Sequence, residues 1–166
     1  PLEQQIAFGT VQMLWDRGEV SGYVQHLTDR TFDRWLVDAA RSLAAQVRFD
    51  KPDRPRLQLG GDAESILAFD AVDRTFYAVR QGPNLVAGHR TMPLPTGALT
   101  AFEGAELFDA HVGGQPVRVA LVRVEQAPQA VEVYVAETLI KRQAVRRDLQ
   151  LMLVPLAVLL VAAALA

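Results

Sequence analysis

Apolar side chains recur every three or four residues from 20 to 47, which predicts one long helix near the start of the chain. The apolar positions are Val24, Leu27, Phe32, Leu36, Ala39, Ala40, Leu43 and Val47. Asp and Arg residues, among them Asp33, stand between these positions, and charges on an amphipathic helix normally face water. We therefore expect the charged run to form a solvated face, with Asp38 and Arg41 as a surface pair.

Beyond residue 73 the helical spacing gives way to alternation, which predicts five antiparallel strands. They are expected at residues 74–80, 85–88, 106–112, 116–124 and 130–136. Turn residues at 81–84 and 113–115 join the first four strands into two hairpins, and prolines make 90–100 a connector. A long helix followed by antiparallel strands indicates an α+β domain.

Two of the expected strands carry more information than the others. Residues 116–124 are apolar at nearly every position, so this strand should be covered on both faces and lie inside the sheet. Residues 130–136 alternate, so their three valines should point inward, whereas Glu132 and Tyr134 should point outward.

The remaining segments are expected to be a loop and two helices. Two prolines and two glycines predict a loop over residues 50–61, and Asp62 is a suitable N-cap for a short helix after it. A longer helix should begin at Glu137, because nothing between Thr138 and Pro155 breaks it.

The last sixteen residues, 151–166, carry no charged side chain. As a helix they cover roughly 24 Å, short of the roughly 30 Å hydrocarbon core, so we expect a truncated transmembrane helix. The alternative is a buried C-terminal helix. The expected organisation is an N-terminal helical or membrane-proximal segment 1–27, a folded domain 28–136, and a connecting helix with its transmembrane part over 137–166.

Composition excludes several kinds of protein. The 166-residue chain has a net charge of −2, which gives no electrostatic footprint for nucleic acid, so no nucleic-acid partner is expected. The absence of cysteine excludes a disulfide framework, a thiol nucleophile and a zinc–thiolate site. No serine-nucleophile, P-loop, dinucleotide-binding or zinc-protease motif is present, so we expect no catalytic and no metal-binding residues in this chain.

Four segments, in this order, resemble the N-terminal sensor region of bacterial two-component sensor histidine kinases of the tricarboxylate-transport-regulator type. They are TFDRWLVDAARSLA (31–44), RTFYAVRQGPNLVAGHRTMPLP (74–95), ELFDAHVGGQPVRVALV (106–122) and VEVYVAETLIKRQAV (131–145). The resemblance extends over about residues 28–166. It implies a PAS-like domain with a five-stranded antiparallel sheet on the periplasmic side of the bacterial inner membrane, held between two membrane helices.

The resemblance also implies parts that lie beyond Ala166. A cytoplasmic kinase core would carry the phosphoacceptor histidine and bind ATP and magnesium, so no cofactor is expected in the present chain. The partners implied are a second copy of the chain, a response regulator and the membrane. Two features depart from the family: charges at Asp16, Arg17 and Glu19 where a first span should end, and basic residues over 141–147 on the outer side of the second.

The candidate ligand site is an anion pocket. Arg118 lies two residues into the most apolar strand, where a lone charge is costly without a partner, and Arg is suited to bind carboxylates. The residues expected to line the pocket with it are Arg80, His89, Arg90 and Tyr77. The alternative is that Arg118 forms a structural ion pair with Asp109 or Glu132.

The second hairpin also offers a candidate pair of metal ligands. Asp109 and His111 are two residues apart on one strand and so share a face, but an exposed polar edge explains this spacing better than a metal does.

The function expected is therefore a ligand-sensing input domain of a membrane sensor histidine kinase, which detects a small anion such as a di- or tricarboxylate. The alternative is a membrane-tethered protein-interaction module that binds a partner through its exposed sheet edge. The parent protein resembles an ATP-dependent protein-histidine kinase, whereas an enzyme acting within this fragment is not expected.

Overall fold

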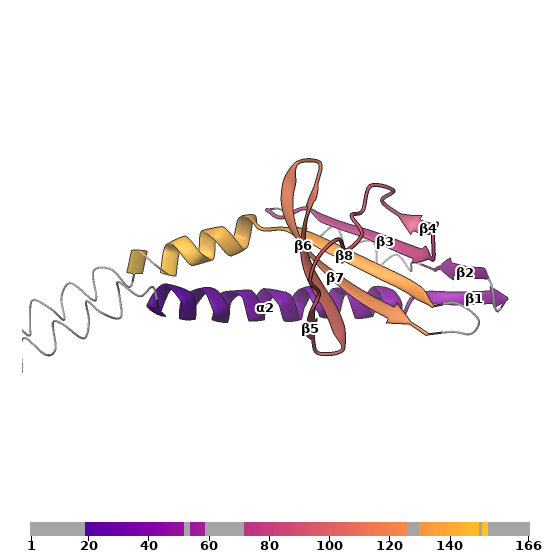
Figure 1. Cartoon of the computed structure of the whole chain (residues 1–166), viewed down its shortest axis with the longest axis horizontal. Coiled ribbons are helices and arrows are strands. Elements are labelled where there is room, and N and C mark those ends of the chain that lie inside the picture. Colours follow the sequence, from indigo (N-terminus) through magenta and orange to yellow (C-terminus); the bar gives the residue numbers. More distant parts are fainter. Residues whose placement is uncertain (1–18, 52–53, 59–71, 126–129, 150, 153–166) are drawn as a thin grey trace, which may run out of the picture. The chain divides into compact units, whose positions relative to one another are not determined.

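The computed structural model describes residues 19–51, 54–58, 72–125, 130–149 and 151–152 (Figure 1). Its labelled elements are α2 (Glu19–Ala44), β1 (Val47–Lys51), β2 (Arg54–Leu57), β3 (Thr75–Gln81), β4 (Asn84–Gly88), β5 (Thr100–Phe102), β6 (Ala105–Val112), β7 (Gln115–Val124) and β8 (Val131–Thr138). The chain divides into two compact units, Phe32–Lys141 and Pro1–Thr31 with Arg142–Ala166. The predicted α+β class is confirmed by these elements.

The larger unit is built on a six-stranded sheet whose strand order is β4-β3-β8-β7-β6-β5. All neighbouring strands are antiparallel. β8 is the last strand in the sequence, yet it lies in the middle of the sheet between β3 and β7 (Figure 1). β1 and β2 form a separate two-stranded hairpin.

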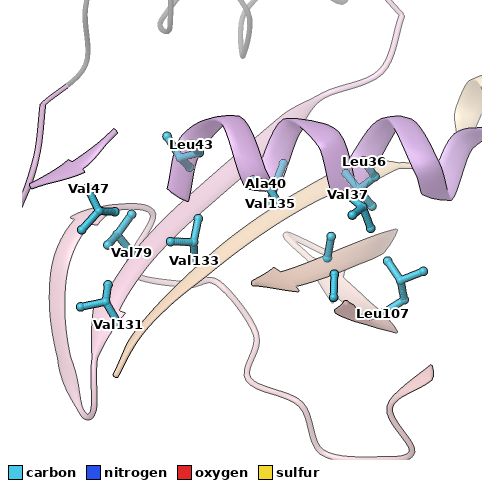
Figure 2. Close-up of a cluster of buried hydrophobic side chains, with 12 residues drawn as sticks. Leu36, Val37, Ala40, Leu43, Val47, Val79, Leu107, Val131, Val133 and Val135 are labelled. Atoms are coloured by element: carbon cyan, nitrogen blue, oxygen red, sulfur yellow. The ribbon is translucent and has the colours of Figure 1, made fainter. Parts of the chain in front are cut away.

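The C-terminal part of α2 covers one face of this sheet. Its buried residues Leu36, Val37, Ala40 and Leu43 form a hydrophobic cluster, the helix-side cluster, with valines of β3 and β8 (Figure 2). These four residues repeat at helical spacing, so they share one face of α2 and are removed from water together. Burying each large aliphatic side chain of this kind stabilises the fold by roughly 1.5–3 kcal/mol.

The opposite face of the sheet has its own apolar cluster. Phe108 of β6, Val119 of β7 and Tyr134 of β8 belong to it, and the connector after β4 covers it with Met92, which is 3% exposed. A sheet covered on both faces needs central strands without an exposed side. The expectation that Tyr134 points outward is therefore wrong, since only 1% of it is exposed.

Both predicted hairpins and the connector between them are present, but the predicted number of strands is too small. The five expected strands correspond to β3, β4, β6, β7 and β8, and β7 is an inner strand as predicted. The structure adds β5, a three-residue edge strand that pairs with β6.

The predictions for residues 45–61 also need correction. The long helix ends at Ala44, so Val47 begins β1 instead of ending the helix, and part of the expected loop is β2. The hairpin forms because Val47 is buried in the helix-side cluster, with Phe49 and Leu57 packed against it. The short helix expected after Asp62 lies outside the described residues.

The passage from sheet to C-terminal helix differs from the sequence prediction. β8 continues through Glu137 to Thr138, Leu139 is a bend, and helix occupies residues 140–149. The expected helix start at Glu137 is wrong, because this residue is still a strand residue and is paired with Thr75. A bend therefore separates the strand from the helix.

In the smaller unit, the C-terminal helix lies beside the N-terminal part of α2. Arg146 Nη2 is 3.2 Å from Asp29 Oδ1, and both side chains are partly exposed. Among the described residues, no helix is long and apolar enough to cross a membrane. The expected span over 151–166 lies outside this description from residue 153 onward.

Candidate functional site

Arg118 lies on the helix-covered face of β7 and contacts two carboxylates. Its Nε and Nη2 donate to Asp33 of α2 at 3.3 and 3.2 Å, and its Nη1 donates to Asp109 of β6 at 3.0 Å. The side chains of Arg118 and Asp33 are 17% and 8% exposed, whereas that of Asp109 is 76% exposed. The ion pair expected with Asp109 is confirmed, and the one considered with Glu132 is not formed.

The electrostatics of Arg118 reflect these two partners. Burial by itself lowers the pKa of the guanidinium, but the hydrogen bonds and charges of Asp33 and Asp109 outweigh it, so the pKa is raised. Three of the five N–H donors of an arginine are used in these bonds. An anion that approaches Arg118 therefore meets two carboxylates already in place.

Asp33 is the partner that the sequence prediction placed wrongly. It was expected on the solvated face of the helix, yet it is buried in the structure. Asp33 lies three and four residues before Leu36 and Val37, so helical geometry puts it on their face. That spacing was the signal that identifies it as a buried carboxylate in need of a cation.

A second charged cluster lies on the opposite face of the sheet. Glu132 of β8 accepts a 2.6 Å hydrogen bond from the Tyr134 hydroxyl and lies 3.3 Å from Arg123 Nε. Arg123 Nη1 is also 2.9 Å from Glu106 of β6. Burial, followed by the hydrogen bond and charge of Glu132, raises the pKa of Tyr134. Arg123 thus neutralises two carboxylates, and Tyr134 stays protonated.

Among the predicted ligand residues, Arg80 is the one whose buried donor lacks a partner in the described structure. It lies directly opposite Glu132 in the β3–β8 register, but no carboxylate of the described chain is within ion-pair distance of it. Its Nη2 donates to the Pro83 carbonyl at 3.3 Å, and its buried Nε has no hydrogen-bond partner. An unpaired buried N–H group is unfavourable, and a bound anion would satisfy it.

Tyr77, His89 and Arg90 lie at the other end of the β3–β4 hairpin. The backbone N–H of His89 donates to the Tyr77 carbonyl at 2.8 Å, and the two rings meet edge to face with centroids 6.4 Å apart. Gly88, at φ 92°, allows this approach, because a Cβ there would collide with the Tyr77 carbonyl. Arg90 is exposed.

The structure brings some of the predicted site residues together and separates others. Tyr77 and His89 are in contact. Arg80 lies on the same hairpin, but it is three residues further along β3 than Tyr77, so the two side chains are on opposite faces of the sheet. Arg118 is two strands away on β7, because β8 lies between β3 and β7. It is also on the opposite face of the sheet from Arg80, since their partners on β8, Glu137 and Glu132, are five residues apart.

Asp109 and His111 of β6 belong to no metal-binding group among the described residues. In the part of the chain that the structure describes, no three His, Cys, Asp or Glu side chains are grouped to hold a metal ion. Asp109 is bound to Arg118, and His111 is exposed. The two residues therefore form part of the polar surface of β6.

Sequence reasoning missed Asp73, which lies just before β3 and is 2% exposed. Its Oδ1 accepts hydrogen bonds from the Thr138 hydroxyl at 2.6 Å and from the Ile140 backbone N–H at 2.9 Å. Its Oδ2 accepts from the Lys141 backbone N–H at 3.1 Å. No local pattern indicates this contact, since the partners lie 65 to 68 residues apart.

A comparison with protein families gives one match that spans most of the chain. The family model described as "Two-component sensor kinase N-terminal" matches residues 20–149, which include α2 from its second residue onward, the eight labelled strands and the helix over 140–149. No curated protein and no solved structure matches the chain at a significant level. The matched range includes both charged clusters and Asp73.

Proposed function

Because the chain belongs to the family of two-component sensor kinase N-terminal domains, we propose that it detects a small anionic metabolite for a membrane sensor histidine kinase. The family match over residues 20–149 carries this proposal. A helix that follows the central strand of the sheet after a single bend supports it, because such a connection links the folded domain to the following chain.

The proposed topology places residues 28–148 outside the cytoplasmic membrane, on the periplasmic side, with a transmembrane helix from residue 151. Under this proposal the domain is PAS-like and works as a homodimer. A kinase core further along the parent protein would bind ATP and magnesium, carry the phosphoacceptor histidine, and transfer phosphate to a response regulator. The uncharged run over 151–166 supports the membrane part of the proposal.

For the ligand we propose a di- or tricarboxylate bound by Arg80. His89 and Arg90 lie on the same hairpin, whereas Tyr77 packs on the helix-covered face of the sheet and is not a contact in this proposal. Arg80 has a buried N–H without a partner, and a carboxylate is a strong acceptor for a guanidinium. Arg118, with two carboxylates bound, is then a structural residue, or a ligand contact that requires the exposed Asp109 to move away.

The proposed mechanism is a population shift. A ligand that binds one arrangement of the β3–β4 hairpin more tightly than another favours that arrangement by its difference in affinity. β3 pairs with β8 from Thr75 to Gln81, so a change in β3 acts on the central strand, which leads into the C-terminal helix.

Thermal unfolding with a panel of carboxylates tests the ligand proposal. A carboxylate at 100 times its Kd should stabilise the domain by about 2.7 kcal/mol and raise its Tm by on the order of 10 °C. Arg80→Met should abolish that rise, whereas Arg118→Met should lower the starting Tm and keep the rise. Arg56→Met, at an exposed arginine of β2, is the matched control and should change neither value.

Two outcomes would contradict the ligand proposal. If no carboxylate raises the Tm of the wild type, small-anion sensing is wrong, and the membrane-tethered interaction module becomes the better explanation. If Arg80→Met keeps the full rise and Arg118→Met loses it, the anion is bound at Arg118.

Reporter fusions test the topology separately. A reporter that is active only outside the cytoplasm should work when fused after Ala136 and fail when fused beyond the complete span. The reverse pattern would place the domain in the cytoplasm, as the basic residues over 141–147 would favour on their own.

A further inference from the structure

Hydrogen bonds join the start of the C-terminal helix to the residues just before β3. Asp73 accepts two backbone N–H bonds from the first turn, at Ile140 and Lys141, and a third bond from the Thr138 hydroxyl. The Thr138 hydroxyl in turn accepts a 3.0 Å hydrogen bond from the Arg74 backbone N–H. The Thr138 backbone N–H donates to the Arg74 carbonyl at 3.1 Å. These bonds form one joint between two chain segments.

A helix normally receives its N-cap from the residue just before it. The first N–H groups of a helix lack partners within the helix, and a side chain such as Asp, Asn, Ser or Thr usually satisfies them from the cap position. Here Leu139 precedes the helix and has no such group. A buried carboxylate from a distant segment therefore takes the capping role, and its negative charge suits the positive end of the helix.

This placement matters because the backbone path from β8 to the helix is interrupted. The ladder between β3 and β8 ends with the pair Thr75 and Glu137, and Leu139 bends the chain before residue 140. A bend without side-chain support would let the helix change direction relative to the strand. Asp73 supplies that support through its bonds to the backbone N–H groups of Ile140 and Lys141.

We propose that Asp73 is a positioning residue of the sensor, through which a movement of β3 sets the orientation of the C-terminal helix. The proposal rests on the proposed sensor-kinase function and adds to it the residue through which β3 acts on the C-terminal helix. β3 has Arg80, the proposed anion contact, near one end and follows Asp73 at the other. Seven residues of extended chain, roughly 23 Å, connect the two ends.

The test uses the full-length parent kinase in lipid nanodiscs and measures basal autophosphorylation, the thermal midpoint, and hydrogen exchange of the amides at 140 and 141. Asp73→Ala removes the bonds that Asp73 accepts from Thr138, Ile140 and Lys141. Thr138→Val removes the hydroxyl but keeps the shape of the side chain, and Thr138→Ser keeps the hydroxyl. Val119→Ala is the control for a general loss of stability, because Val119 is buried in the cluster on the face of the sheet opposite α2.

We expect Asp73→Ala and Thr138→Val to change basal autophosphorylation about fivefold or more, because the helix is no longer held in the orientation that the ligand-free sheet imposes. Exchange of the two amides should become about tenfold faster in Asp73→Ala. Thr138→Ser should match the wild type in both measurements. Val119→Ala should lower the thermal midpoint and leave basal autophosphorylation within about twofold of the wild type.

The outcomes separate this proposal from the one it rests on. If the wild-type protein shows no autophosphorylation, the sensor-kinase proposal is wrong, and the role of Asp73 fails with it. If the wild type is active but Asp73→Ala and Thr138→Val change autophosphorylation no more than Val119→Ala does, Asp73 is only a stabilising cap. If Asp73→Ala does not fold, Thr138→Val against Thr138→Ser decides the question.

Discussion

Replacing Arg118 with Met is the most direct test of how the helix is held on the sheet. The variant leaves the Asp33 carboxylate, 8% exposed, without its bidentate partner. Removing one partner of a buried ion pair costs about 3–5 kcal/mol, because the remaining charge is uncompensated. The Arg118 side chain is 17% exposed, so water can reach the site, and Met retains the apolar stem. We therefore expect a loss of about 2–4 kcal/mol.

Asp109 adds little to this value. Its side chain is 76% exposed, and exposed ion pairs contribute about 0–1 kcal/mol. Urea unfolding of a soluble fragment of residues 28–148, followed by far-ultraviolet circular dichroism, measures the change. With a urea m value of about 2 kcal/mol/M, the midpoint should fall by roughly 1–2 M.

Two further variants separate the buried charge from its surroundings. Arg118→Met combined with Asp33→Leu removes both charges and should recover most of the lost stability, since apolar side chains often replace a buried ion pair at no cost. Arg34→Met is the control. Arg34 forms a shorter ion pair, 2.6 Å long, with Glu103, but this pair is exposed, so its loss should leave the urea midpoint unchanged. An Arg118→Met midpoint equal to that of the wild type would refute the reasoning, as would a double variant no more stable than the single one.

Three other predictions follow from contacts on or near the sheet. Tyr134→Phe should lower the free energy of unfolding by about 1.5–3 kcal/mol at neutral pH, because the hydrogen bond to Glu132 is lost. Because burial raises the pKa of Tyr134, the wild type should also lose stability as the pH rises above about 10. Urea midpoints measured at neutral pH and above about pH 10 test this, and a variant whose midpoint falls with pH as much as that of the wild type would contradict it. Gly88→Ala should destabilise the β3–β4 hairpin by more than about 1 kcal/mol, because Cβ collides with the Tyr77 carbonyl; an unchanged melting temperature would disprove it. Inserting Gly-Gly after Arg142 should uncouple ligand from kinase output while the domain melts normally, and an insertion variant that still switches would exclude transmission by a stiff helix.

Alternation along the chain was sufficient to predict the two hairpins and β8. These strands are long, have valine or aromatic residues at regular positions, and are separated by turn residues, so local sequence and tertiary packing favour the same structure. β1 and β2 were missed because the two prolines and two glycines of residues 50–61 predict a loop, and because the helical spacing of apolar residues extends to Val47. They form a strand pair because Phe49 and Leu57 pack against the helix-side cluster, which is a tertiary effect.

The candidate site was predictable only in part. The Arg118 ion pair with Asp109 followed from the sequence, because a charge within an apolar strand requires a partner nearby. Asp33 was available from helical spacing but was assigned to the solvated face with the other charges of α2. Asp73 had no sequence signal at all, since its partners are near residue 140 and only the pairing of β3 with β8 brings them together.

The central position of β8 determines when this domain completes its sheet during synthesis. The hairpin β3–β4 and the three strands β5–β6–β7 are formed from neighbouring segments, but among the strands that the structure describes only β8 pairs with both groups. The six-stranded sheet can therefore be completed only after Thr138 has left the ribosome. Before that moment, β3 and β7 each have an unpaired edge, and such edges readily join with other chains. A protein truncated before residue 131 should accordingly aggregate instead of forming a smaller folded domain.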